Sequence, residues 1–197
     1  MSNKEKLLNL IQNNNGVVLR KDLKEQNIPS IYLTIFVNEN ILERIGRGIY
    51  IDINTFGDDF FKTQAASKYA IYSNNTALYL HGLSNRTPIT YDITVPYNYN
   101  GSLMNNKNTN IFRVNRSILE LGLISMKSPS GQDIKVYDKE RTICDVVKNK
   151  KKIDNEIIND AIKKYVASND FDSYKLNKYA KILKVEKEIG KYLEVLL

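Results

Sequence analysis

The sequence has one cysteine, one histidine and no tryptophan among its 197 residues. A single cysteine, Cys144, cannot form an internal disulfide or a multi-thiolate metal site, which excludes zinc fingers and disulfide-stabilised secreted scaffolds. No run approaches the roughly 18 uninterrupted apolar residues of a membrane-spanning helix. Residues 1–10 also lack the apolar core of a signal peptide. We therefore expect a cytoplasmic protein with no membrane segment, no metal and no cofactor.

The charges are of both signs, with 29 Lys and Arg against 22 Asp and Glu, and the net charge is +7. A positive balance favours an anionic partner. Residues 1–51 hold 7 basic and 5 acidic side chains (+2), and residues 81–150 hold 10 and 6 (+4). Because the positive charge is spread along the chain, the composition alone does not identify the partner.

The first 51 residues have the element order of a winged helix-turn-helix. Apolar residues at helical spacing predict three short helices, over residues 4–12, 20–26 and 31–38. Two alternating runs then flank Gly46-Arg47-Gly48, a pattern typical of a β-hairpin. In this order the third helix can enter the major groove of DNA, while the hairpin turn contacts sugar and phosphate.

The third predicted helix has an inner face and an outer face. Leu33, Phe36 and Val37 are expected to pack against the first two helices, and Ser30 is expected to cap the helix. The outer face consists of Ile31, Thr34, Ile35 and Asn38. The residues expected to bind DNA are Ser30, Tyr32, Thr34 and Asn38 on this helix, and Arg20, Lys21, Arg44 and Arg47 at phosphates. A winged helix that contacts protein is the alternative, because isoleucine on the outer face suits either partner.

A linker is predicted over residues 54–59, with a domain boundary near residue 55. It divides the chain into a DNA-binding domain, residues 1–54, and a second domain, residues 55–197. In the second domain we expect helices over 58–72 and 76–80, strands at 92–95, 111–114, 123–126 and 134–137, and helices from residue 139 onward. The predicted fold class is α+β: a winged helix-turn-helix followed by a mixed α/β domain with a small sheet and C-terminal helices.

No catalytic constellation is recognised in the second domain. His81 is expected at a helix end, and Cys144 is expected to be a buried structural thiol. Arg141 and Asp145 are four residues apart on a predicted helix and are expected to form an ion pair worth about 0.3 kcal/mol. The lysines that recur every third residue are expected to be solvated; they are Lys175, Lys178, Lys181, Lys184 and Lys187.

One pattern in the second domain imitates a nuclease. Asp92 on one predicted strand and Asp133 with Lys135 on another are the residue types that hold a divalent metal and stabilise developing charge. An Asp-x-Lys triplet is common by chance in a chain rich in lysine. A metal-dependent nuclease with a winged-helix targeting domain therefore stays an alternative, as does a transcription factor whose second domain senses a ligand or mediates dimerisation.

Four segments in order carry a resemblance to a known family: LERIGRGIY at 42–50, TALYLHGL at 76–83, ITVP at 93–96 and RTICD at 141–145. With the amino-terminal winged helix, these segments resemble the AbiEi family of abortive-infection antitoxins. The similarity spans nearly the whole chain and thins after about residue 150. Arg44, Arg47 and the third helix match the operator-binding region of the family, although this helix is less basic than a strong DNA binder would suggest.

The resemblance implies a bacterial type IV antitoxin that takes part in phage resistance and represses its own operon. Such a protein binds inverted repeats in its promoter, has no enzymatic activity, and neutralises a nucleotidyltransferase-like toxin without a stable complex. The amino-terminal domain binds the operator, and the carboxy-terminal domain serves antitoxicity. The basic residues expected on the antitoxicity surface are Arg86, Arg113, Arg116, Lys148, Lys150, Lys151 and Lys152.

Overall fold

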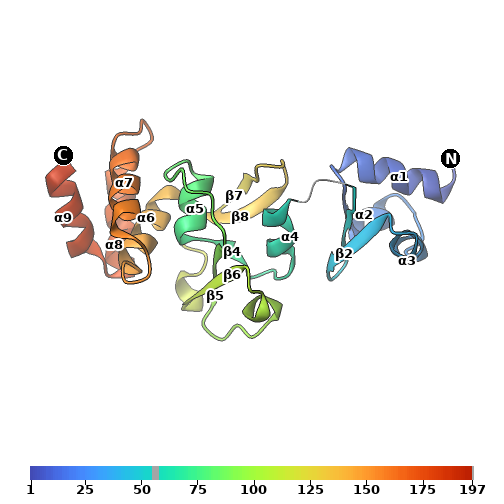
Figure 1. The fold of residues 1–197 in the computed structure, drawn as a ribbon, viewed down its shortest axis with the longest axis horizontal. Coiled ribbons are helices and arrows are strands. Elements are labelled where there is room, and N and C mark those ends of the chain that lie inside the picture. Colours follow the sequence, from blue (N-terminus) through green and yellow to red (C-terminus); the bar gives the residue numbers. More distant parts are fainter. Residues whose placement is uncertain (55–57, 197) are drawn as a thin grey trace. The chain divides into compact units, whose positions relative to one another are not determined.

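The structure is a computed structural model that describes residues 1–54 and 58–196. The chain forms two compact units, Met1–Lys68 with Lys127–Ile134 and Tyr69–Met126 with Lys135–Leu197 (Figure 1). Both units combine helices and strands, which confirms the α+β class. Residues 55–57 of the predicted linker lie outside the described residues, and the boundary near residue 55 stays a prediction. No described helix is long and apolar enough to cross a membrane.

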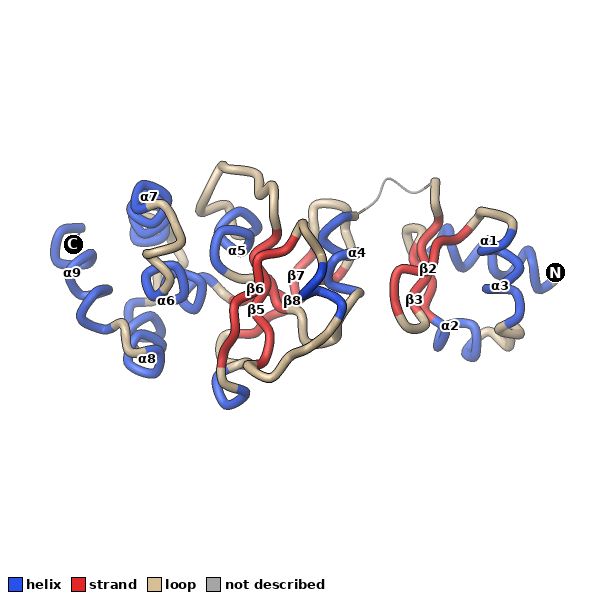
Figure 2. Tube along the Cα trace, turned by 60° about the horizontal axis from the view of Figure 1, so that its bottom comes forward, coloured by secondary structure: helices blue, strands red, loops and turns tan. Residues whose placement is uncertain are grey.

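The first unit opens with three helices and a three-stranded sheet. Its elements are α1 (Asn3–Asn13), β1 (Val17–Leu19), α2 (Arg20–Glu25), α3 (Ile31–Asn38), β2 (Leu42–Gly46), β3 (Ile49–Asp52) and α4 (Asp59–Ala65). The strand order is β1-β3-β2, and both pairs are antiparallel. Helices α1, α2 and α3 lie on one side of this sheet (Figure 2). The three helix bounds agree with the sequence prediction to within one residue.

The core of the first unit explains why these short helices pack. Helices α1, α2 and α3, strands β1 and β2 and the α2–α3 turn contribute its buried apolar side chains, namely Leu7, Leu10, Ile11, Val18, Leu23, Ile28, Leu33, Phe36 and Leu42. The turns between them use asparagine in the left-handed region, with φ +50° at Asn15, +54° at Asn27 and +53° at Asn40. Asparagine adopts this conformation at little cost, so each helix ends sharply and the next can turn back onto the core.

The second unit is built on a mixed sheet. The described elements are β4 (Ile71–Tyr72), α5 (Asn74–Leu80), β5 (Tyr91–Pro96), β6 (Thr109–Val114), β7 (Leu123–Lys127), β8 (Asp133–Tyr137), α6 (Lys139–Lys148), α7 (Asn155–Val166), α8 (Ser173–Leu183) and α9 (Glu186–Leu196), with 3₁₀ turns at Ser102–Asn105 and Arg116–Ile118. The five-stranded sheet has the order β6-β5-β4-β8-β7. Strand β4 is antiparallel to β5 and parallel to β8, and β5 is parallel to β6. Strand β6 is therefore an edge strand.

The helix predicted over residues 58–72 is wrong in its second half. Helix α4 ends at Ala65, and Ile71 and Tyr72 form the central strand β4. Tyr72 pairs with Ile93 on one side and with Val136 on the other, and its side chain is fully buried. A short apolar segment that is buried on both faces has no alternation, so its periodicity cannot distinguish a strand from a helix.

Helices α6 to α9 lie together beyond the sheet (Figure 1). They share one core cluster with α5, and this cluster includes Cys144 on α6. The thiol is fully buried, and burial raises its pKa to about 12. A thiol with so high a pKa stays protonated and unreactive at neutral pH. The expectation of a buried structural thiol is therefore confirmed.

The ion pair expected between Arg141 and Asp145 is confirmed, and it is buried inside the unit. The Arg141 side chain is 0% exposed and that of Asp145 is 6% exposed, with 3.0 Å between Nε and Oδ2. The Nη1 atom of Arg141 also donates to the carbonyl oxygens of Ile118 at 2.8 Å and Leu121 at 2.9 Å. The guanidinium lies 4.2 Å from the ring centroid of Tyr137. Arg141 thus joins α6 to the segment between β6 and β7 from inside the unit.

Candidate functional site

Helix α3 is held in place by the side chains on its inner face. Leu33 and Phe36 are buried in the core of the first unit. At the carboxy end of the helix, the Nζ atom of Lys4 on α1 lies 2.9 Å from Oε2 of Glu39 and 5.8 Å from the ring centroid of Phe36. These contacts fix α3 against α1, so that its opposite face is directed to solvent.

The outer face of α3 is narrower than the sequence predicted. Ile31, Thr34 and Asn38 are exposed, and Ile31 is 59% exposed. Ile35 was expected on this face, but it is partly buried and packs against the core together with Tyr32. The phenol ring of Tyr32 therefore belongs partly to the core, while Thr34 and Asn38 carry the polar groups that point outward.

Ser30 precedes α3 but does not cap it as expected. Its backbone is helical, with φ −64° and ψ −14°, and its side chain makes no capping hydrogen bond. A capping hydroxyl requires an extended backbone at this position. The Ser30 side chain is exposed, so its hydroxyl stays available to a ligand.

The β2–β3 turn lies beside the start of α2. Gly48 in this turn has φ +75°, and its carbonyl oxygen accepts a hydrogen bond from the backbone N–H of Arg20 at 2.8 Å. Arg47, at the tip of the turn, is exposed, as are Arg20 and Lys21. Three of the four predicted phosphate-binding residues are thus brought to one end of the unit. The fourth, Arg44, lies on β2 and donates from Nε to the Gly46 carbonyl oxygen at 3.3 Å.

The charge of this region comes from outside α3. Residues 31–38 contain no charged side chain, so the helix offers hydroxyl, amide and apolar groups only. Cations at the turn and at α2 suit the nonspecific part of nucleic-acid binding, whereas Thr and Asn suit the reading of base edges. In this arrangement the turn and α2 can attract phosphate, while α3 can discriminate between bases.

The basic residues predicted for antitoxicity lie in several different surroundings. Arg86 is engaged with acidic neighbours, because its guanidinium lies 3.0 Å from Glu156 and 3.6 Å from Asp154. Arg113 on β6 donates to the Met104 sulfur at 3.4 Å. The remaining cations of this set are exposed, at Arg116, Lys148, Lys150, Lys151 and Lys152. The set is therefore not one uniform basic patch, and its role stays a prediction.

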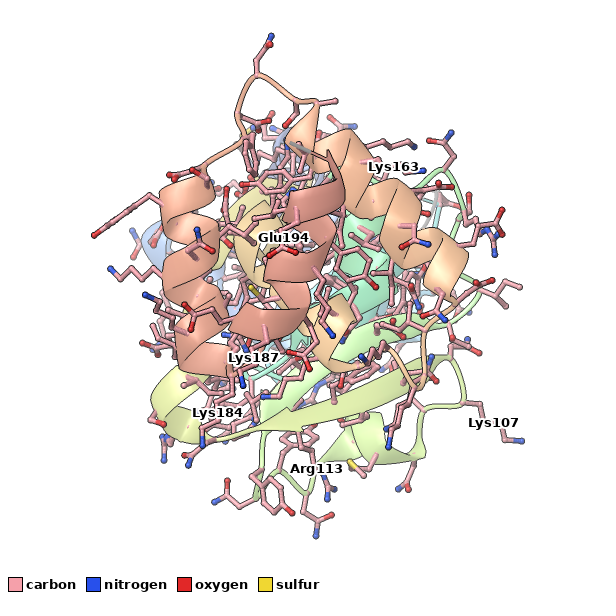
Figure 3. All side chains as sticks on the ribbon, turned by 90° about the vertical axis from the view of Figure 1, so that its left-hand side faces the viewer. Lys107, Arg113, Lys163, Lys184, Lys187 and Glu194 are labelled. Carbon is pink, nitrogen blue, oxygen red and sulfur yellow. The ribbon has the colours of Figure 1, made fainter. Side chains whose placement is uncertain are left out.

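Most lysines of the C-terminal helices are solvated, as expected, with one exception. Figure 3 places Lys184 and Lys187 near the turn between α8 and α9, apart from Lys163 on α7. Lys175 is only partly exposed, because its Nζ atom lies 2.9 Å from the buried Glu140 carboxylate and 3.1 Å from that of Asp138. This lysine neutralises two buried acids and contributes to the structure of the unit.

The residues considered for catalysis do not converge. His81 is the C-cap of α5, as expected, and its Nε2 lies 2.7 Å from the Tyr137 carbonyl oxygen, while burial lowers its pKa. Asp133 on β8 forms an exposed ion pair with Lys127 at 2.9 Å, and β4 separates β8 from β5, which carries Asp92. Within residues 1–54 and 58–196, no group of three His, Cys, Asp or Glu side chains could hold a metal ion.

A polar cavity of about 450 Å³ lies between the edge strand β6, α5 and the loop after α6. Its lining includes Asp92, which is only 2% exposed, together with Asn75, Asn110 and Lys152. The sequence pattern pointed to Asp92 only as a metal ligand, and it did not point to Asn75 or Asn110. The available signal was a charged residue inside an otherwise apolar strand, DITV, because a carboxylate at such a position needs polar partners.

Comparison with known proteins bears on the first unit. A family described as "Transcriptional regulator, AbiEi antitoxin" has a model that matches residues 5–51. The match covers α1 to β3 and confirms the predicted resemblance to AbiEi antitoxins. It covers none of the second unit. No curated protein matches the chain.

Proposed function

We propose, from the premise that residues 5–51 carry an AbiEi-type regulator domain, that this protein represses its own operon and acts as the antitoxin of a type IV toxin–antitoxin system. One observation supports the proposal most directly: Thr34 and Asn38 are exposed on the outward face of α3. The same unit contains the basic turn between β2 and β3. In this proposal residues 1–54 form a winged helix-turn-helix domain, and the chain has no enzymatic activity of its own.

The proposed mode of DNA binding follows from the chemistry of these elements. Helix α3 enters the major groove, where Asn38 and Thr34 meet base edges and the exposed Ile31 can contact a thymine methyl group. The turn at Arg47 lies over the sugar-phosphate backbone, and Arg20 and Lys21 approach a neighbouring phosphate. A two-fold operator, such as an inverted repeat in the promoter, would be bound by two copies of the chain.

Promoter binding is the first test, and Arg47 is the residue to change. Arg47→Ala is expected to weaken binding to promoter and random DNA alike by about tenfold, because one phosphate contact is lost. The slope of log K against log salt concentration should fall by about 0.9. Fluorescence anisotropy with the two duplexes at several salt concentrations measures both quantities.

Lys4→Ala is the matched control for Arg47→Ala. It removes the same charge from the same unit, but the ammonium group of Lys4 is already paired with Glu39 at 2.9 Å. Its salt slope should therefore stay at the wild-type value. An unchanged slope in Arg47→Ala, or equal losses in the two variants, would contradict a phosphate contact at the turn.

The antitoxin part of the proposal is tested by co-expression. Growth of cells that express the neighbouring nucleotidyltransferase-like toxin should be rescued by the full chain. Because the second unit is assigned to neutralisation, Arg47→Ala should rescue growth as well as the wild type while repressing the promoter more weakly. Loss of rescue and repression together in this variant, at equal protein level, would argue against separate roles for the two units. Failure of the wild type to rescue would leave only the repressor.

A further inference from the structure

The cavity of about 450 Å³ adjoins a second one of about 280 Å³ in the same unit. The two share Ile111, Phe112 and Lys152 in their lining, so they lie next to each other along the edge strand β6. We call the larger one the acceptor cavity and the smaller one the basic cavity. Together they have the size of a small-molecule site.

The acceptor cavity is built around a buried carboxylate. Asp92 Oδ1 accepts from Asn110 Nδ2 at 3.0 Å, and Oδ2 accepts from the Asn75 backbone N–H at 3.0 Å. The Asn75 side chain is a further hydrogen-bond partner of this carboxylate. An ionised carboxylate has about four acceptor sites, so one is left for a ligand. Asp92 and Asn110 are direct neighbours in the β5–β6 register, which places both on one face of the sheet. Burial raises the pKa of Asp92, and the Asn110 hydrogen bond opposes this shift.

A second acceptor in this cavity lacks a donor. Asn75 Oδ1 is buried and has no hydrogen-bond partner within the described parts of the chain. A buried acceptor without a donor costs free energy, and such groups are rare in folded proteins. Asn75 and Asp92 therefore offer two acceptors that a ligand with N–H groups would satisfy.

The basic cavity has more cations than acids in its lining, and its acidic residue Asp145 is paired with Arg141. Lys148, Lys152 and Arg113 contribute to its lining, and all three are exposed. The Nζ atom of Lys152 lies 5.5 Å from the ring centroid of Phe112, at the junction of the two cavities. Three cations at the mouth of a cavity favour phosphate or another anion. The ring of Phe112 offers a surface on which a planar group can stack.

We propose that the second unit binds a nucleoside phosphate whose base carries an exocyclic amino group. The base lies in the acceptor cavity against Phe112 and donates to Asp92 and Asn75, and the phosphates lie at Lys148 and Lys152 in the basic cavity. Adenine, guanine and cytosine have such an amino group, whereas uracil does not. The site is independent of α3, so it would act as a sensor or second function of the chain.

Calorimetric titration of the full chain with ATP, GTP, CTP and UTP separately tests the proposal. At least one of the first three should bind with a Kd below about 1 mM and about tenfold more tightly than UTP. Pyrophosphate alone should bind more weakly than that nucleotide. Equal binding of UTP, or of pyrophosphate, would overturn the assignment of the base to the acceptor cavity. Binding of a single-stranded oligonucleotide without binding of any mononucleotide would overturn the proposal.

Variants separate the two halves of the site. Lys152→Ala should lower the affinity for the nucleotide by about tenfold. Lys151 is an exposed neighbour outside both linings, so Lys151→Ala should leave this affinity unchanged. Asn75→Ala should lose part of the discrimination against UTP, because the acceptor Oδ1 is removed. The variant also removes the side-chain hydrogen bond to Asp92, so its free energy of unfolding is measured alongside. Equal affinities for Lys152→Ala and Lys151→Ala would contradict the phosphate position. Because none of these measurements involves DNA or the toxin, their failure is distinguishable from failure of the proposed function.

Discussion

Arg141→Met is expected to lower the free energy of unfolding of the second unit by about 3–5 kcal/mol. The substitution keeps the volume of the side chain but leaves the Asp145 carboxylate buried without its partner. It also leaves the carbonyl oxygens of Ile118 and Leu121 without their donor. Each loss removes a partner from a buried polar group, which is costlier than losing an exposed contact. Urea unfolding followed by circular dichroism measures the change.

Two further variants distinguish the buried pair from a general effect of charge. Arg116→Met removes an exposed arginine, and its stability should stay within about 0.5 kcal/mol of the wild type. Arg141→Met combined with Asp145→Leu should be more stable than Arg141→Met alone, because no uncompensated charge remains. If Arg141→Met and Arg116→Met had the same free energy of unfolding, water would have to reach the Asp145 carboxylate. The burial of the Arg141–Asp145 pair would then be refuted.

The amino-terminal unit was predicted closely because its signals are local. Gly48 with its positive φ, the asparagines that end the helices, and the apolar positions of α1 to α3 each act within a few residues. On α3, prediction failed at Ser30, which does not cap the helix, and at Ile35, which is partly buried although its spacing put it on the outer face. On a two-turn helix the apolar stripe is wide, and the partner elements decide which edge of it is covered.

In the second unit, prediction failed where residues far apart in the sequence determine the partners of a side chain. Nothing near Arg141 in the sequence indicates that residues 118 and 121 supply carbonyl oxygens to it, so an i, i+4 pair was the natural interpretation. The RTICD segment lies outside residues 5–51, which the family model matches, so its part in the resemblance stays a prediction. Likewise the partnership of Asp92 with Asn110 depends on the parallel pairing of β5 with β6, which the intervening loop does not reveal.

Asn38→Ala is expected to cost about 1–3 kcal/mol in binding to the operator and nothing in binding to random DNA, if its amide reads a base edge. Thr34→Ala should behave in the same way with a smaller effect, since a hydroxyl cannot make the bidentate contact to a base edge that an amide makes. Both side chains are exposed, and alanine favours helix, so neither variant should destabilise α3. Anisotropy titrations with an operator duplex and a scrambled duplex at one salt concentration measure the difference.

The contrast between Asn38 and Arg47 distinguishes DNA reading from the alternative of protein contact by α3. Loss of specificity in Asn38→Ala beside a uniform loss in Arg47→Ala assigns the helix to base edges and the turn to phosphate. If both variants lost affinity equally on both duplexes, α3 would contribute no sequence information. If neither variant changed DNA binding, the exposed Ile31 would have to be explained by a protein partner, because an apolar group at 59% exposure on an uncharged helix suits that surface as well.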